Sequence, residues 1–221
     1  MNALPSKERT ELRANPVTLI CFAVKEEAKF FPKAGDPKIR ILVTGMGRRN
    51  AEQAVRRAIA AERPDLVLTA GFAGGLNPDW STGTVVFDAE GQPALTNALL
   101  AAGARPGRFF CSDKVATTTE EKRALRRQTS ADAVEMESEA IVAVCREQRI
   151  PAATIRVILD AAAEDLPLDF NALMDENKAL DSRKLALVLI KSPCLIPRLL
   201  RLQKQSRAAA QRLAAVLERI V

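Results

Sequence analysis

Short apolar runs with β-strand character alternate with helical patterns along most of this 221-residue chain. The β-type runs lie at 17–24, 39–44, 66–69, 84–87, 109–111, 133–136 and 153–159. Between them, apolar residues recur at helical spacing over 51–59 and 136–144, and Thr118 with Glu121 forms a capping box for a helix through Arg127. This alternation predicts a single-domain α/β fold, with a central twisted sheet, mixed or parallel, flanked by helices.

The length of the chain fits one sizeable core, which we place at residues 17–221. Residues 1–16 are predicted to be a flexible, charged leader without the apolar segment of an export signal, and residues 181–221 to be basic helices. The four cysteines stand far apart, which favours reduced thiols over a zinc site. These features predict a cytoplasmic protein, with membrane association left open.

The chain contains neither histidine nor tyrosine. Catalytic Ser-His and Cys-His pairs and histidine-ligated metals are therefore excluded, and acid–base chemistry must depend on carboxylates, lysine or water. We expect no metal and no cofactor. Residues 181–221 hold nine basic and two acidic residues, so this tail alone accounts for the net charge of +6. Because no aromatic residues interleave with the basic ones, nucleic-acid binding is the least favoured function.

Ligands of α/β sheets bind at the carboxyl ends of the strands. Three segments with glycine or acidic residues follow such ends: Glu26-Glu27, 44–47 with Arg48 beside it, and 71–75. Glycines there allow backbone amides to approach an anion or a ribose, although a tight turn explains them equally well. Arg48 is either a phosphate ligand or a solvated surface arginine, and one carboxylate of the Glu-Glu pair could face the cleft.

Two further carboxylates have competing interpretations. Glu137 arrives where a helix is predicted to begin, and it either serves a site or complements the helix dipole. Asp160 ends the apolar segment 152–159 and precedes three alanines. In apolar surroundings the pKa of such an aspartate rises, so that it can act as a general acid, but it could also cap a following helix.

Taken in order, these segments resemble the nucleoside phosphorylase and nucleosidase superfamily across residues 17–165. Within it, the hopanoid-associated nucleoside phosphorylases are the most similar group, by 112–117, Glu121-Lys122 and the ending 192–202. The superfamily resemblance rests on five stretches: 22–27, 44–47, 69–76, 133–138 and 156–160.

This resemblance implies cleavage of the bond between base and sugar in a purine nucleoside, with adenine released from adenosylhopane in the most similar group. Asp160 would protonate or hydrogen-bond N7 of the purine, and Glu137 would accept hydrogen bonds from the ribose hydroxyls. Met136 would pack against the sugar, and Glu27 aligns with the carboxylate that activates water. The substrate-binding segments would be Gly71, Phe72, Ala73 and Gly74, the base-flanking Val115 and Ala116, and Arg48.

The chain departs from the family pattern at Phe72, where relatives often have a small or hydroxyl residue, and at Leu159, where many have serine or asparagine. The segment between Asp88 and Arg108 is also shorter than in the nucleosidases, and it lacks the aromatic residues expected there. These departures favour a bulky, hydrophobic 5′ substituent. They also leave a methylthioadenosine/adenosylhomocysteine-type nucleosidase and a non-catalytic nucleoside-binding relative as alternatives.

The nucleophile and the role of the tail stay open. Glu27 favours water, whereas the name of the most similar group and Arg48 favour phosphate as a co-substrate. The tail carries a helical stripe of Ala209, Leu213, Val216, Leu217 and Ile220, which either packs on the sheet or contacts a membrane surface peripherally. The family likeness also predicts a homo-oligomer.

Overall fold

A computed structural model describes residues 16–31, 36–175 and 178–221 of the chain. Of the predicted leader, only Pro16 lies within the described residues. The strands are β1 Thr18–Phe22, β2 Ile39–Val43, β3 Leu66–Gly75, β4 Val85–Asp88, β5 Arg105–Pro106, β6 Phe109–Cys111, β7 Ala133–Glu135 and β8 Ala152–Asp160. The α-helices are α1 Lys25–Ala28, α2 Arg48–Ala61, α3 Pro93–Ala101, α4 Thr119–Thr129, α5 Ser138–Glu147, α6 Phe170–Leu173, α7 Ser182–Lys191 and α8 Ile196–Ile220, and a 3-10 turn, η1, spans Pro193–Leu195.

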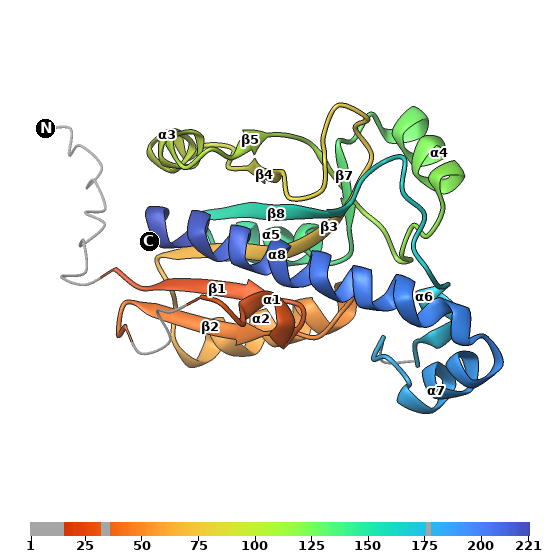
Figure 1. Cartoon of the computed structure of the whole chain (residues 1–221). Coiled ribbons are helices and arrows are strands. Elements are labelled where there is room, and N and C mark those ends of the chain that lie inside the picture. The colour runs from red at the N-terminus through yellow and green to blue at the C-terminus, as the bar shows by residue number, and fades with distance from the viewer. Residues whose placement is uncertain (1–15, 32–35, 176–177) are drawn as a thin grey trace, which may run out of the picture.

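In the described part of the chain the strands form one eight-stranded mixed sheet in the order β2-β1-β3-β8-β4-β5, with β7 joining β3 to β6. The pairs β1–β2, β1–β3 and β3–β8 are parallel, whereas β4 and β7 run antiparallel to their neighbours β8 and β3. Helices α2 and α5 cover one face, and α8 crosses the other (Figure 1). The predicted fold class is therefore confirmed.

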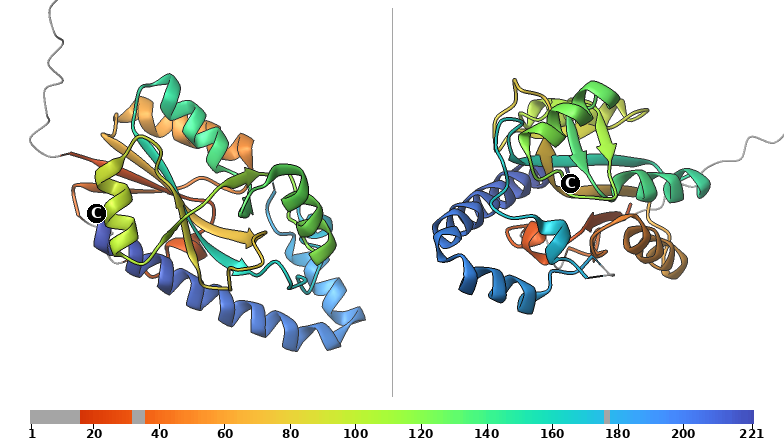
Figure 2. Two further views of the ribbon diagram at one scale, coloured as in Figure 1. Left: turned by 90° about the horizontal axis from the view of Figure 1, so that it is seen from above. Right: turned by 90° about the vertical axis from the view of Figure 1, so that its right-hand side faces the viewer.

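Side-chain alternation along the central strands creates the two faces. Leu19 and Cys21 of β1 pack with α2 and α5, whereas Ile20 and Phe22 join the cluster under α8. Figure 2 shows α8 running across the sheet from α3 toward the α6–α7 segment. Within the described residues, no helix is both long and apolar enough to cross a membrane.

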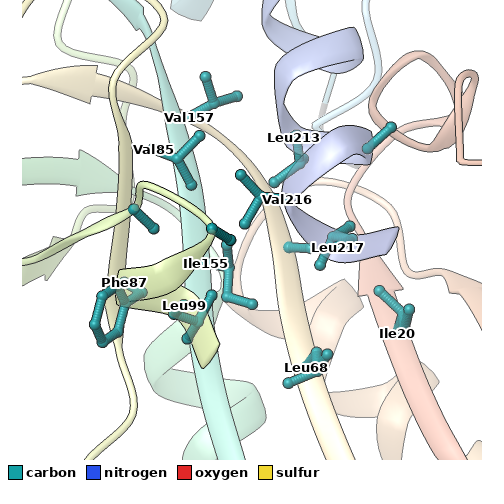
Figure 3. Close-up of a cluster of buried hydrophobic side chains, with 14 of the residues drawn as sticks. Ile20, Leu68, Val85, Phe87, Leu99, Ile155, Val157, Leu213, Val216 and Leu217 are labelled. Carbon is teal, nitrogen blue, oxygen red and sulfur yellow. The ribbon is translucent and has the colours of Figure 1, made fainter. Parts of the chain in front are cut away.

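The apolar stripe of α8 is part of the core. Leu213 and Leu217 are fully buried and Val216 nearly so, facing Ile20 and other sheet residues (Figure 3). Truncating a buried leucine of this kind to alanine costs about 2–5 kcal/mol. Packing on the sheet is therefore the correct interpretation of this stripe, and the stripe cannot also face a membrane.

The glycine-rich stretch after residue 69 was expected to be a turn or loop, and this prediction was wrong. β3 continues through Gly75, since β8 pairs with it in parallel from Val67 to Gly74, with an irregularity between Ala73 and Gly74. The backbone of the stretch is therefore held by sheet hydrogen bonds. Its glycines serve the close approach of side chains from other elements, as described next.

Candidate active site

Glu27 is a buried carboxylate held by three backbone amides. It lies in the short helix α1, directly after β1, where its Oε2 accepts hydrogen bonds from the amides of Ala23 (2.8 Å) and Val24 (3.1 Å). Its Oε1 accepts one from the amide of Phe72 in β3 (2.7 Å). Burial raises the pKa of Glu27, and these hydrogen bonds and the charge of Arg156 oppose that rise.

Gly71 makes room for this carboxylate. A Cβ atom at Gly71 would lie 2.5 Å from Glu27 Oε1 and 2.8 Å from its Cδ, closer than real Cβ contacts allow. On the same strand, a Cβ at Gly74 would lie 3.5 Å from Asp160 Oδ2. The two glycines thus leave space on β3 for the carboxylates of α1 and β8. Gly71 and Gly74 are separated by three residues of strand rise, roughly 10 Å.

A buried ionic cluster joins β7, α5 and β8. Arg156 Nη2 lies 2.8 Å from Glu135 Oε2 and 4.0 Å from Glu137 Oε2, and it also donates to the hydroxyl of Thr69 at 2.9 Å. Burial favours the neutral form of Glu135, but Arg156 and Ser138 outweigh it and hold the pKa of this carboxyl below its usual range. The sequence analysis included Arg156 only as a member of the stretch 156–160. A signal for its role was present, because a charged residue inside an apolar strand requires a buried partner.

Glu137 is the N-cap of α5 and is only 6% exposed. Its Oε1 accepts a 2.8 Å hydrogen bond from the amide of Gly47, at the start of α2. Burial raises its pKa to about 7, with Arg156 opposing the rise and Glu135 and Glu27 adding to it. The 44–47 turn therefore serves a carboxylate of the protein itself. The neighbouring Met136 is buried as well.

Asp160 forms an ion pair with Lys122 of α4, with Oδ2 and Nζ 2.5 Å apart. Asp160 is 6% exposed and Lys122 is fully buried. Burial raises the pKa of Asp160, and the ammonium of Lys122 opposes the rise. The helix-cap alternative was wrong, since the three alanines after Asp160 form a turn and the next helix begins at Phe170. Lys122 was not predicted, because sequence pattern gave no sign that α4 packs against β8.

Arg48 is tied to neighbouring groups. It pairs with Glu139 (2.7 Å) and Asp113 (3.3 Å) and donates to the carbonyl of Cys111. Its charge is thus already compensated by two carboxylates, which makes it a poor phosphate ligand in this arrangement. The alternative of a simply solvated arginine is also incomplete, because these contacts join α2 to β6 and α5.

The remaining predicted residues are spread around this region. Phe72 is half-buried and packs with the cluster under α8, whereas Ala73 packs with Ile158 and Val86 in a separate cluster. Val115 uses both of its backbone groups on the side-chain amide of Asn171, at 2.9 Å each. Backbone recognition of a base by this segment would therefore depend on Ala116.

Asp160 also lines a cavity of about 230 Å³. Its other walls are the segment 164–167 and one side of α8, with Arg198, Arg201 and Leu202. Within the described residues no cluster of metal-ligating side chains occurs. The site as a whole therefore offers buried carboxylates, each held by a specific partner, for acid–base and cation-stabilising chemistry.

Comparisons with known proteins identify the relatives of this chain. The sequence model of the phosphorylase superfamily matches residues 4–87 and 86–191. A 5′-methylthioadenosine/S-adenosylhomocysteine nucleosidase of Chromohalobacter salexigens is 28% identical over 177 residues, which cover 63% of this chain and 74% of that protein.

Solved structures share the fold. The 5′-methylthioadenosine/S-adenosylhomocysteine nucleosidase of Neisseria meningitidis, in complex with methylthio-immucillin-A, superposes with a TM-score of 0.66 and 18% identity over 92% of this chain and 97% of that one. The futalosine hydrolase of Helicobacter pylori gives a TM-score of 0.63 and 18% identity, again over 92% and 97%.

Proposed function

The chain belongs to the phosphorylase superfamily, and on this premise we propose that it hydrolyses the N-glycosidic bond of a purine nucleoside. One observation carries the proposal: Glu27 and Asp160, both buried, face β3 at Gly71 and Gly74, roughly 10 Å apart along the strand. That spacing leaves room for a ribose between a group that activates the nucleophile and a group that serves the departing base.

The reaction requires help at both ends of the breaking bond. Cleavage passes through a ribosyl cation, so an enzyme gains most from negative charge beside the sugar and a proton for the base. In the proposed arrangement Glu137 accepts hydrogen bonds from the ribose hydroxyls, with Met136 against the sugar. Asp160 serves N7 of the purine. Glu27 takes a proton from the attacking water, and no cofactor is needed.

We propose water rather than phosphate as the nucleophile. Glu27 and Glu137 are neighbouring carboxylates, and they would repel a phosphate dianion. Arg156, which lies beside Glu137, is engaged by Glu135, and Arg48 is engaged by Glu139. Base release should therefore proceed equally well in phosphate-free buffer. A strict dependence on phosphate would show that the enzyme is a phosphorylase, and binding of a nucleoside without any base release would show a non-catalytic relative.

For the substrate we propose an adenine nucleoside with a bulky hydrophobic 5′ substituent, of the adenosylhopane type. Phe72, whose amide binds Glu27, and Leu159, which precedes Asp160, add partly buried apolar side chains to this region of the sheet. The similar proteins named for methylthioadenosine and adenosylhomocysteine support a smaller thioether substituent as the second candidate. Comparing kcat/KM for adenosine, methylthioadenosine and adenosylhopane separates the candidates, since preference for either smaller substrate contradicts the hydrophobic proposal.

Peripheral contact with an anionic membrane would suit such a substrate, and we propose α7 as the contact surface. This helix has the sequence SRKLALVLIK but no buried residue, and Leu187 (57%) and Ile190 (75%) are exposed. Ile196 and Leu200, at the start of α8, are exposed too. Residues 182–217 contain eight basic residues and no acidic one. Exposed leucines and isoleucines amid a net positive charge fit a surface that inserts shallowly into anionic lipid.

An isologous contact with a second copy would place this positive surface against itself, so we favour lipid as its occupant. The homo-oligomer that the family likeness predicts would then use another face. The test is flotation with phosphatidylglycerol vesicles, comparing wild type with Leu187→Ser/Ile190→Ser. Deleting residues 181–221 is not informative, because it removes the core helix α8. Binding that survives the double substitution, or that is equal for neutral vesicles, would contradict the assignment.

A further inference from the structure

We propose that Lys122 is the proton source behind Asp160, so that the two side chains act as one proton-donating pair. This inference deepens the proposed function by identifying a positioning residue outside the carboxylate set. The Lys122 side chain is fully buried, although lysine is among the residues least often fully buried.

The Lys122 ammonium contacts three oxygens at the end of β8 and in the turn that follows it. Its Nζ donates to the carbonyls of Ala161 (2.9 Å) and Glu164 (2.5 Å) and lies 2.5 Å from Asp160 Oδ2. An ammonium has three hydrogens, so the two carbonyls leave one for Asp160. The capping box of Thr118 and Glu121 fixes the start of α4 and therefore the position of this lysine.

The pairing resolves a conflict in the expected role of Asp160. A general acid must carry a proton, but an adjacent ammonium favours the ionised carboxylate. The proton can, however, move from Nζ to Oδ2 without changing the net charge of the pair. Desolvation by the substrate penalises two separated charges, so it favours the neutral pair of carboxylic acid and amine.

The proton can then be followed through the reaction. As the bond between C1′ and N9 breaks, its electron pair moves onto the purine, N7 takes a proton from Asp160, and Asp160 takes one from Lys122. Asp160 is 6% exposed and lines the cavity beside α8, so its carboxyl group is open to the base. Water adds to C1′ and loses its proton to Glu27. Proton exchange with solvent then restores Glu27 and Lys122.

The activity of substituted enzymes distinguishes a purely structural role of Lys122 from a proton-donating role. Arginine can keep the positive charge and the carbonyl contacts, but its pKa is too high for it to give up a proton. A structural role would therefore be rescued by Lys122→Arg, and a proton-donating role would not. The leaving group supplies a second distinction, because 4-nitrophenolate departs without being protonated whereas adenine does not.

The experiment compares Lys122→Arg, Lys122→Gln and Lys122→Met with wild type on methylthioadenosine and on 4-nitrophenyl β-D-ribofuranoside. The exposed Lys38→Met is the matched control. We expect kcat for methylthioadenosine to fall about 10²–10⁴-fold in all three Lys122 variants, and that for the nitrophenyl riboside to fall less than about 10-fold.

Melting temperatures establish which variants fold, and Lys122→Arg and Lys122→Gln retain a donor for the carbonyls should Lys122→Met not fold. Equal losses on both substrates in a folded variant, or full activity of Lys122→Arg, would overturn the proposal. Failure of wild type to release adenine from any adenine nucleoside is a separate result, since it would overturn the proposed function itself and this inference with it.

Discussion

Replacement of Gly71 by alanine tests the central geometric feature of the site, the contact between β3 and Glu27. The added Cβ would lie 2.5, 2.8 and 3.0 Å from three atoms of the Glu27 carboxyl group. An ordinary contact is about 3.5–4.0 Å, so the carboxylate must retreat by about 1 Å. That movement would disturb its hydrogen bonds from the amides of Ala23, Val24 and Phe72.

The expected losses follow from this displacement. Overpacking at a rigid site costs about 1–3 kcal/mol in the free energy of unfolding. For a chain of this length each kcal/mol lowers Tm by about 2–4 °C, so the expected decrease is about 2–12 °C. Misplacing a catalytic group by about 1 Å costs on the order of 10²-fold in rate, and we expect kcat for base release to fall accordingly.

A double-mutant cycle isolates the contact, because the three atoms nearest to the added Cβ all belong to Glu27. We would measure Tm and the free energy of unfolding for Gly71→Ala, Glu27→Ala and the double variant. In the Glu27→Ala background, Gly71→Ala should cost less than about 0.5 kcal/mol, giving a coupling energy of about 1–3 kcal/mol. Additive losses, or a Gly71→Ala enzyme with wild-type kcat and Tm, would refute the idea that glycine is needed here for the carboxylate.

Three further predictions concern the buried carboxylates. Glu27→Gln should lower the rate of base release about 10²–10⁴-fold, measured with and without phosphate; activity retained only in phosphate would indicate phosphorolysis instead. Because the pKa of Glu137 is raised from 4.5 to about 7, the folded state holds an extra proton between these values, so its contribution to stability is present below pH 4.5 and declines up to pH 7. Glu137→Gln should flatten that decline in a series of Tm measurements against pH, and an unchanged slope would contradict the assignment. Arg156→Met should leave the Glu135 charge unpaired and lower the free energy of unfolding, measured with denaturant, by about 3–5 kcal/mol. The double variant Arg156→Met/Glu135→Leu should recover most of this loss. If it does not, the unpaired Glu135 charge is not the cause of the loss.

The sequence alone determined several strands and helices closely, because their signals are local. β6 has its predicted bounds, β8 differs from its prediction by one residue at each end, and the Thr118–Glu121 capping box starts α4 as expected. Alternation and helical spacing are set by backbone geometry, so they appear in the chain itself. The lack of histidine is likewise a property of composition, and it restricts the chemistry to carboxylates, lysine and water whatever the fold.

The carboxylates themselves were also predictable. Glu27, Glu137 and Asp160 follow directly after apolar runs, and strand ends of an α/β sheet gather at one edge. The conformation of the glycine stretch 71–75 was predicted wrongly because it is not set locally. Whether residues 71–75 turn or extend depends on β8, which supplies the hydrogen-bonding partner and is distant in the sequence.

Only the tertiary structure decided which partner each carboxylate has. Lys122 meets Asp160 because α4 packs at the end of β8, and Arg156 meets Glu135 because β7 and β8 lie on either side of β3. The structure also showed that the stripe of α8 is core and that α7 carries the exposed apolar residues. Ion pairing and burial depend on distances between elements, and these distances arise only when the elements pack, so the local pattern of a sequence does not contain them.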